Sequence, residues 1–280
     1  MLRTRLVACL AGAAVFACSG GDAPGGDHPS ARPDSSRQAL LSAPPVRIVS
    51  LVPVATEILY ELGVGERLVG RTRWDDHPPQ VHDVTDVGDA IRPSVERILM
   101  QDPDLVILIG GSDNSLAARE MERLGIPHAL FLFNTLQDLE RGIAVLGQLV
   151  EQQAAARSLW NRILAELDSV RVAVAGLDRP SVYYDVAFPP AITVGHGSYL
   201  DTLISIAGGR NVFGDLSRPS PQVSLEAILD RDPDLIIHPE GSDLVMSSPR
   251  PGDRPGWTAL RAVRAGKIQR VPADLVHRPG

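Results

Sequence analysis

The sequence predicts an α/β fold of two similar Rossmann-like lobes that are joined by a long rigid helix. Three observations lead to this prediction. Short apolar segments alternate with amphipathic helical patterns on both sides of residues 136–174, which is typical of parallel sheets covered by helices. Within residues 136–174, apolar side chains recur at spacings of three and four, which predicts a long helical region. A segment near residue 100 recurs near residue 230, which indicates a duplicated lobe.

The first lobe is predicted to span residues 46–150. Its strands are expected where short runs of branched apolar residues occur, and its helices where the apolar spacing is three or four. The expected strands are residues 47–51, 68–69, 105–109 and 129–133. The expected helices are residues 56–62, 95–100 and 117–124.

The helical region between the lobes contains Gly142 and Gly147, two residues that lower helix propensity. They predict an interruption, after which a second helix of roughly 25 residues, about 38 Å long, would follow. We therefore assign residues 151–176 as the linking helix and residues 177–280 as the second lobe.

The repeat has a constant offset. Residues 95–99 (VERIL) lead to 102–107 (DPDLVI), and residues 225–229 (LEAIL) lead to 232–237 (DPDLII). A Gly-Ser pair follows each copy. Asp-Pro-Asp is also a common turn before a strand, but matching flanks in one register favour duplication of the lobe.

The N-terminus predicts export. Arg3 and Arg5 precede a short apolar run that ends in small residues, as in a signal peptide covering residues 1–18. The run closes on Cys18 in a lipobox-like setting, which predicts a lipid-anchored protein on the periplasmic or extracellular face; the alternative is an incidental cysteine in an ordinary secretory signal. Residues 19–45 are rich in Gly, Pro, Ser and Asp and predict a flexible tether.

Composition and motifs exclude several function classes. A formal charge of −7 gives no reason to expect a nucleic-acid partner. The sequence contains no phosphate-binding Gly-x-x-x-x-Gly-Lys-Ser/Thr loop, no Gly-x-Ser-x-Gly elbow and no His-Glu-x-x-His helix, so we expect no catalytic residues, no cofactor and no dedicated metal site. Three loop histidines are candidate axial ligands to a metal held in a macrocycle: His77, His196 and His277. The His196 segment is otherwise interpreted as a turn and N-cap before a helix that begins near Ser198.

Four segments carry a family resemblance: residues 47–57 (RIVSLVPVATE), 74–79 (WDDHPP), 208–211 (GGRN) and 221–226 (PQVSLE). Together they resemble the binding proteins of ABC importers whose two α/β lobes are bridged by a rigid helix, and most closely the cobalamin-binding family. The resemblance implies a ligand cleft between the lobes. The resemblance covers residues 46–280. It implies a monomer that captures a corrinoid outside the cytoplasm and delivers it to an importer made of a permease and its ATPase. It also implies that a final C-terminal helix is missing from the second lobe.

The resemblance implies roles for several ligand-binding residues. In the family, an aromatic residue at the position of Trp74 lies against the corrin ring, and an Asp and an Arg matching Asp274 and Arg278 reach the polar groups of the ligand. An indole suits a flat macrocycle because it offers stacking area at low entropic cost; packing of Trp74 within its own lobe is the alternative. Ala90 and Ser220 align with cleft tryptophans of the best-known members, so another corrinoid or a different metal chelate stays open as the ligand.

Two glutamates at equivalent places in the repeat, Glu96 and Glu226, match family residues that dock onto arginines of the permease. Their simpler interpretation is stabilisation of a helix dipole. Two alternative functions also stay open. One is a haem or ferric-siderophore binding protein of the same class, and the other is an extracytoplasmic enzyme on a two-lobed α/β scaffold.

Overall fold

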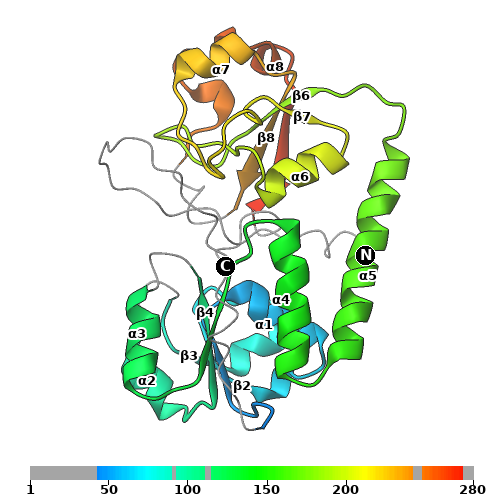
Figure 1. The fold of residues 1–280 in the computed structure, drawn as a ribbon. Coiled ribbons are helices and arrows are strands. Elements are labelled where there is room, and N and C mark those ends of the chain that lie inside the picture. Colours follow the sequence, from blue (N-terminus) through cyan, green and yellow to red (C-terminus); the bar gives the residue numbers. More distant parts are fainter. Residues whose placement is uncertain (1–42, 90–92, 111–114, 242–247, 274–280) are drawn as a thin grey trace. The chain divides into compact units, whose positions relative to one another are not determined.

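The computed structural model describes residues 43–89, 93–110, 115–241 and 248–273. Within these residues the chain forms two compact units (Figure 1). The first unit holds the residues up to Phe133 together with Glu140–Leu159, and the second holds Asn134–Leu139 and the residues from Trp160 onward. Both units are mixed α/β structures with a parallel sheet, which confirms the predicted fold class.

The sheet of the first unit is entirely parallel, in the order β3-β2-β1-β4-β5. This is the strand order of a Rossmann sheet. The chain adds β2 and β3 on one side of β1 and then adds β4 and β5 on the other side, so the order of the strands reverses between β1 and β4. The strands are β1 (Ile48–Ser50), β2 (Leu68–Arg71), β3 (Thr85–Asp86), β4 (Leu105–Ile109) and β5 (His128–Phe131). The four strands expected from the sequence are thus present, with shifts of one or two residues at some ends.

Helices cover both faces of this sheet (Figure 1). They are α1 (Pro53–Glu61), α2 (Val95–Met100) and α3 (Ser115–Arg123), with the short helices η3 (Gly65–Arg67) and η4 (Pro79–Asp83). Alternate strand residues such as Val49 and Val106 pack with Ile98 of α2 and Met121 of α3 in a closed apolar core. Because β1 and β4 are buried on both faces, they appear in the sequence as short continuous apolar runs.

The long helical region forms α4 (Leu136–Leu149) and α5 (Gln153–Ala173). The predicted interruption is present next to the expected start of the linking helix at residue 151, but Gly142 and Gly147 do not cause it, because both lie inside α4 and the break after α4 contains Glu151 at φ +60°. The two glycines instead permit close packing. A Cβ on Gly142 would lie 2.4 Å from the Phe133 ring, and one on Gly147 would lie 2.4 Å from the Ala156 Cβ. None of the helices within the described ranges is long and apolar enough to cross a membrane.

The second unit has a smaller parallel sheet in the order β7-β6-β8-β9. Its strands are β6 (Ser181–Tyr184), β7 (Arg210–Asn211), β8 (Leu235–Glu240) and β9 (Ile268–Pro272). Its helices are α6 (Tyr199–Ile206), α7 (Leu225–Arg231) and α8 (Arg261–Arg264), with η6 (Pro251–Asp253) and η7 (Trp257–Ala259). Tyr183 and Ile236 of the sheet pack with Phe213, Ile228 and Trp257 in the core of this unit.

The sequence repeat is also a structural repeat. Each copy forms a helix, a turn and a central strand: α2 and β4 in the first unit, α7 and β8 in the second. The first aspartate of each turn adopts a positive φ, +47° at Asp102 and +34° at Asp232. Since this conformation is uncommon for a residue other than glycine, its presence at both positions supports duplication.

Candidate functional site

The predicted ligand-binding side chains follow the carboxyl ends of strands. Trp74 and His77 come after β2, His196 comes after β6, and Ser220 comes after β7. In open parallel sheets, ligands bind outside the carboxyl ends of the strands, near the point where the strand order reverses. The placement of these four residues within their own units therefore suits ligand recognition.

Trp74 presents part of its indole to solvent. The side chain is 40% exposed, so it is not packed into the core of its unit. The guanidinium of Arg73 lies 5.7 Å from the centre of the indole and forms an ion pair with Asp89. His77, in the same loop, is half-buried. An exposed aromatic face beside a cation can stack on a flat ligand.

A hydrogen-bonded turn holds the backbone of Trp74. Asp75 is buried, and its Oδ2 accepts from the backbone N–H of Thr72 at 2.8 Å and from the Thr72 hydroxyl at 2.5 Å. The same Thr72 oxygen accepts from the N–H of Trp74 at 3.2 Å. Burial raises the pKa of Asp75, and the hydrogen bonds from Thr56 and Thr72 oppose this effect in part. Sequence reasoning did not single out Asp75, although Thr-x-x-Asp has the Ser/Thr-x-x-Asp/Glu spacing of a capping box, in which the two side chains bond to each other's backbone N–H groups.

In the second unit, the backbone brings the loops of His196 and Ser220 together. The N–H of Gly195 donates to the Pro219 carbonyl at 3.0 Å, next to Ser220, and the N–H of His196 donates to the Leu216 carbonyl at 2.7 Å. A Cβ on Gly195 would lie 2.0 Å from a carbonyl oxygen of this segment, so only glycine fits. The two candidate residues thus belong to one loop pair.

The His196 side chain points away from the core. It is 73% exposed, and its Nδ1 lies 3.7 Å from the carboxylate of Asp201. The predicted N-cap at Ser198 is confirmed, because its side chain accepts from the N–H of Asp201 and α6 begins at the next residue. An exposed imidazole on a glycine-bounded turn is accessible to a ligand.

A buried charge cluster that sequence reasoning missed lies where β6 ends. Arg254 forms a bidentate ion pair with Asp185, in which Nη1 donates to Oδ1 at 2.9 Å and Nη2 donates to Oδ2 at 2.6 Å. His238 Nδ1 lies 2.7 Å from Oδ2 of the same carboxylate. The guanidinium sits over the rings of Phe188 and Trp257, at 4.4 and 4.5 Å. Burial favours a higher pKa for Asp185, but His238 and Arg254 bring the pKa below its usual value. Since 69 residues separate Asp185 from Arg254, no local pattern could have indicated the pair.

Glu96 and Glu226 occupy equivalent positions, each two residues after a serine N-cap. The Ser94 side chain accepts from a backbone N–H at the start of α2, and Ser224 does the same for α7. The pKa of Glu226 is lowered by hydrogen bonds from its own backbone N–H and from the Ser224 hydroxyl. Both glutamates are exposed at their helix N-termini, which is where the helix dipole favours a carboxylate.

Glu96 also lines a surface hollow of about 530 Å³ between α2 and α3. Leu99 and Met100 line it as well and are 45% and 75% exposed, so the hollow has an apolar wall. Glu120 and Arg123 form an ion pair at its other side. The first unit thus presents an exposed carboxylate next to apolar surface.

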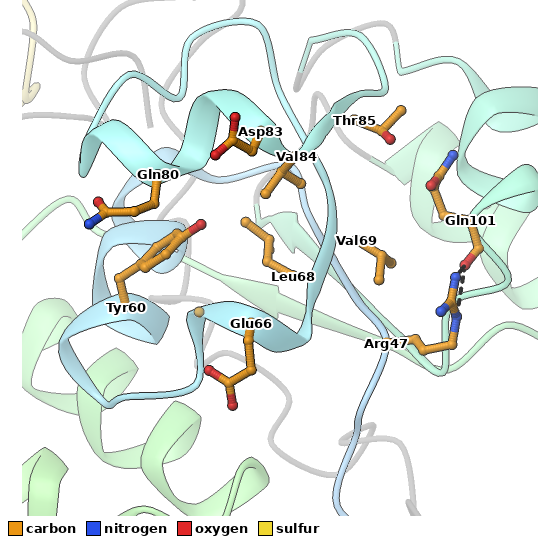
Figure 2. Close-up of a pocket in the computed structure, with 11 residues that line it drawn as sticks. Arg47, Tyr60, Glu66, Leu68, Val69, Gln80, Asp83, Val84, Thr85 and Gln101 are labelled. Atoms are coloured by element: carbon orange, nitrogen blue, oxygen red, sulfur yellow. Dashed lines mark hydrogen bonds between the residues drawn. The ribbon is translucent and has the colours of Figure 1, made fainter.

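A second hollow, of about 540 Å³, lies in the first unit near the amino ends of the strands, opposite to the carboxyl ends that the predicted ligand loops follow (Figure 2). Its lining includes Arg47, Leu68 and Thr85, which stand at or just before the amino ends of their strands. Figure 2 shows the Arg47 guanidinium turned to Gln101, whose carbonyl it contacts from Nε at 3.0 Å. The Arg47 guanidinium therefore holds a turn. The strand residues that line the hollow stand at the amino ends of their strands, whereas the predicted ligand loops follow the carboxyl ends.

Five predicted residues lie outside the described part of the chain. They are Cys18, Ala90, Asp274, His277 and Arg278. In the sequence, Ala90 directly follows Asp89, and Asp274 directly follows Ala273. Among the described residues, no group of three or more His, Cys, Asp or Glu side chains is arranged to hold a metal ion.

Comparison with known proteins places these features in a family context. The family described as periplasmic binding protein matches residues 48–275. The chain is 29% identical over 202 residues to a vitamin B12-binding protein of Vibrio campbellii, covering 72% of this chain and 74% of that relative. The solved periplasmic vitamin B12 binding protein BtuF of Vibrio cholerae is 27% identical, with a TM-score of 0.69 and coverage of 84% of this chain and 91% of that one. The periplasmic heme-binding protein RhuT of Roseiflexus sp. RS-1 is 26% identical, with a TM-score of 0.70 and coverage of 81% and 89%.

Proposed function

This chain belongs to the periplasmic binding protein family, and we propose that it is an exported lipoprotein that captures a corrinoid and delivers it to an ABC importer. The observation that carries the proposal is the similarity to vitamin B12-binding proteins over most of the chain, together with a partly exposed tryptophan at the carboxyl edge of the first sheet. In this account the protein is a monomeric carrier and not an enzyme.

The ligand contacts are assigned from the loops that follow the strands. The Trp74 indole stacks on the macrocycle, since its exposed face offers a large contact area without loss of many rotamers. Asp274 and Arg278 supply polar contacts at the ligand periphery. The exposed imidazole of His196 and the half-buried one of His77 are candidate axial ligands to the central metal, as is His277.

Haem is the second candidate ligand. A solved heme-binding protein matches this chain about as well as a vitamin B12-binding one, with TM-scores of 0.70 and 0.69. Both ligands are flat metal macrocycles, and stacking on Trp74 does not distinguish them. By the resemblance, Ala90 and Ser220 align with tryptophans of the best-known cobalamin binders, and smaller side chains at these positions are also compatible with a different chelate.

The contacts with the permease are assigned to Glu96 and Glu226. Equivalent carboxylates on two similar lobes suit a partner with two similar subunits, because each lobe offers the same charge to one copy of the same surface. The apolar wall formed by Leu99 and Met100 beside Glu96 supports this assignment in the first unit. The importer's ATPase would act through the permease and would not touch this chain.

Export and anchoring are assigned to residues 1–18, with lipid attached at Cys18 and residues 19–45 as the tether. Acyl chains on one cysteine would hold the protein at a membrane surface. Fractionation of cells that produce a Cys18→Ala variant tests this point. Release of the exported variant into the soluble fraction is expected, and full retention at the membrane would reject lipid anchoring.

An optical titration panel tests the ligand. The purified protein is titrated with cyanocobalamin, dicyanocobinamide, haemin and a ferric hydroxamate siderophore, and the absorbance change of each ligand is followed to saturation. Saturation at one equivalent by a corrinoid is the expected result. Saturation by haemin alone would replace the corrinoid assignment with haem, and the absence of binding by all four would reject the class of ligand.

A further inference from the structure

A buried polar cluster lies beneath the Trp74 loop. Ser50 is the last residue of β1, Thr56 lies in α1, and Thr72 and Asp75 follow β2; all four side chains are buried. Asp75 is only 2% exposed, and its Oδ1 is buried without a well-formed hydrogen bond among the described residues, although the nearby Thr56 hydroxyl acts to lower the pKa of the carboxyl. A carboxyl group in this state costs stability, because desolvation of Oδ1 is offset only in part.

Asp75 connects this cluster to Trp74 through one intermediate residue. Its Oδ2 accepts both the N–H and the hydroxyl hydrogen of Thr72, at 2.8 and 2.5 Å. With its hydrogen so directed, the Thr72 oxygen keeps its lone pairs free and accepts from the N–H of Trp74 at 3.2 Å. The N–H of Asp75 closes the same turn on the Thr72 carbonyl at 3.3 Å. The orientation of the Trp74 backbone therefore depends on a carboxylate that does not itself reach the surface.

We propose that Asp75 is a positioning residue that holds the Trp74 indole in its ligand-ready orientation. Because the indole is 40% exposed, packing against the rest of the unit restrains it only in part, and the turn supplies the remaining restraint. A side chain that is already ordered loses less entropy when a ligand stacks on it. The effect on ligand affinity rests on the proposed function, in which the ligand stacks on Trp74. The restraint of the indole by the turn is independent of that proposal.

The chemistry of the turn separates two substitutions. In Asp75→Asn the side-chain carbonyl can still accept both hydrogen bonds from Thr72, so the turn is retained. In Asp75→Ala both acceptors are lost, and the Thr72 hydroxyl is free to rotate away from Trp74. Asp83→Ala is the matched control, since Asp83 is an exposed carboxylate at the end of η4 in the same connection between β2 and β3.

The first readout needs no ligand. Acrylamide quenching of Trp74 fluorescence is obtained for each protein as the difference between the protein with Trp74 and its Trp74→Phe counterpart. We expect quenching to rise in Asp75→Ala and to stay at the wild-type level in Asp75→Asn and Asp83→Ala. Unchanged quenching in a folded Asp75→Ala protein would overturn the proposal. If Asp75→Ala does not fold, Thr72→Val decides in its place, because it removes the link to Trp74 and keeps the side-chain shape.

The second readout is cyanocobalamin affinity. Ordering one side chain costs enough that Asp75→Ala should weaken binding by about fivefold. The same change made in a Trp74→Ala background should have no further effect, since the two residues act through one contact. Additive losses would mean that Asp75 acts elsewhere and would also overturn the proposal. If the wild type binds no cyanocobalamin, the proposed function fails, and the quenching measurement still decides the role of Asp75.

Discussion

Asp234 accepts two hydrogen bonds from Ser181, one from its backbone N–H at 2.8 Å and one from its hydroxyl at 2.6 Å. These bonds tie the turn before β8 to the first residue of β6. The first unit repeats the arrangement, since Asp104 accepts from the N–H groups of Val46 and Arg47 at 2.8 and 3.0 Å. The second aspartate of each Asp-Pro-Asp turn thus sets where the neighbouring strand begins.

The Asp234 contact should be measurable in the stability of the second unit. Asp234→Ala leaves the buried Ser181 N–H and hydroxyl without their acceptor, which should lower the free energy of unfolding by about 1 to 3 kcal/mol. Urea unfolding followed by tryptophan fluorescence, in a Trp74→Phe, Trp160→Phe background in which the buried Trp257 is the remaining tryptophan, measures this change. Asp230→Ala, an exposed carboxylate of α7, is the control and should stay within about 0.5 kcal/mol of wild type. An equal effect of the two variants would contradict the assignment.

The repeat explains why so much of the fold could be predicted from the sequence. Helix α2 and strand β4 have the predicted bounds, because a serine N-cap, an apolar spacing of three and a short buried run all occur within residues 94–109. The interruption of the long helix lies close to the predicted start of the linking helix, but its cause was predicted wrongly. Gly142 does not break the helix; it lies inside α4, where the Phe133 ring occupies the space that a side chain would fill.

The candidate site could be proposed only where it is local in sequence. Trp74 stands in the contiguous segment 74–79, and the resemblance of that segment to the cobalamin-binding family implied its role. Arg254 was not predictable, because its partner Asp185 lies 69 residues away and becomes its neighbour only after the second unit folds. Asp75 was passed over since an aspartate in a polar, proline-rich segment is usually solvated, and nothing in the sequence shows that it is buried.

The buried Arg254 should contribute far more to stability than an exposed arginine. Arg254→Ala leaves the Asp185 carboxylate buried without its main partner, which should cost about 3 to 5 kcal/mol. Arg270→Ala, which removes an exposed ion pair with Glu240, should cost less than about 1 kcal/mol. Urea unfolding, followed by Trp257 fluorescence in the same tryptophan background as above, gives the free energy of unfolding of the two variants. Similar costs for the two variants would show that the buried pair is not a main support of this unit.

Asp75 should make stability depend on pH in a defined direction. Burial raises its pKa in the folded protein, so the folded state holds this proton more tightly than the unfolded state does. As pH rises from the ordinary carboxyl value of 3.8 through the raised value, wild type therefore loses stability relative to Asp75→Asn, which has no proton to lose at this position. Thermal unfolding of both proteins across this range measures the difference. A difference that stays constant with pH, or grows on acidification, would contradict the raised pKa.

The two glutamates should matter for delivery and not for capture. Glu96→Ala combined with Glu226→Ala should leave ligand affinity unchanged, and the lost helix-dipole interaction should cost about 0.3 to 1 kcal/mol per helix. Binding to permease in detergent and uptake by cells should fall sharply. Glu122→Ala, an exposed glutamate in α3, is the control. Normal uptake by the double variant would leave helix stabilisation as the only role of Glu96 and Glu226.

The central claim, that this protein binds a corrinoid through Trp74, is tested most directly by calorimetric titration of wild type and Trp74→Ala with cyanocobalamin. Wild type should bind one equivalent, and loss of the indole should weaken binding by about 1 to 3 kcal/mol. Circular dichroism should show that both proteins are folded. Equal affinities would remove Trp74 from the site, and the absence of binding by folded wild type would contradict the corrinoid assignment itself.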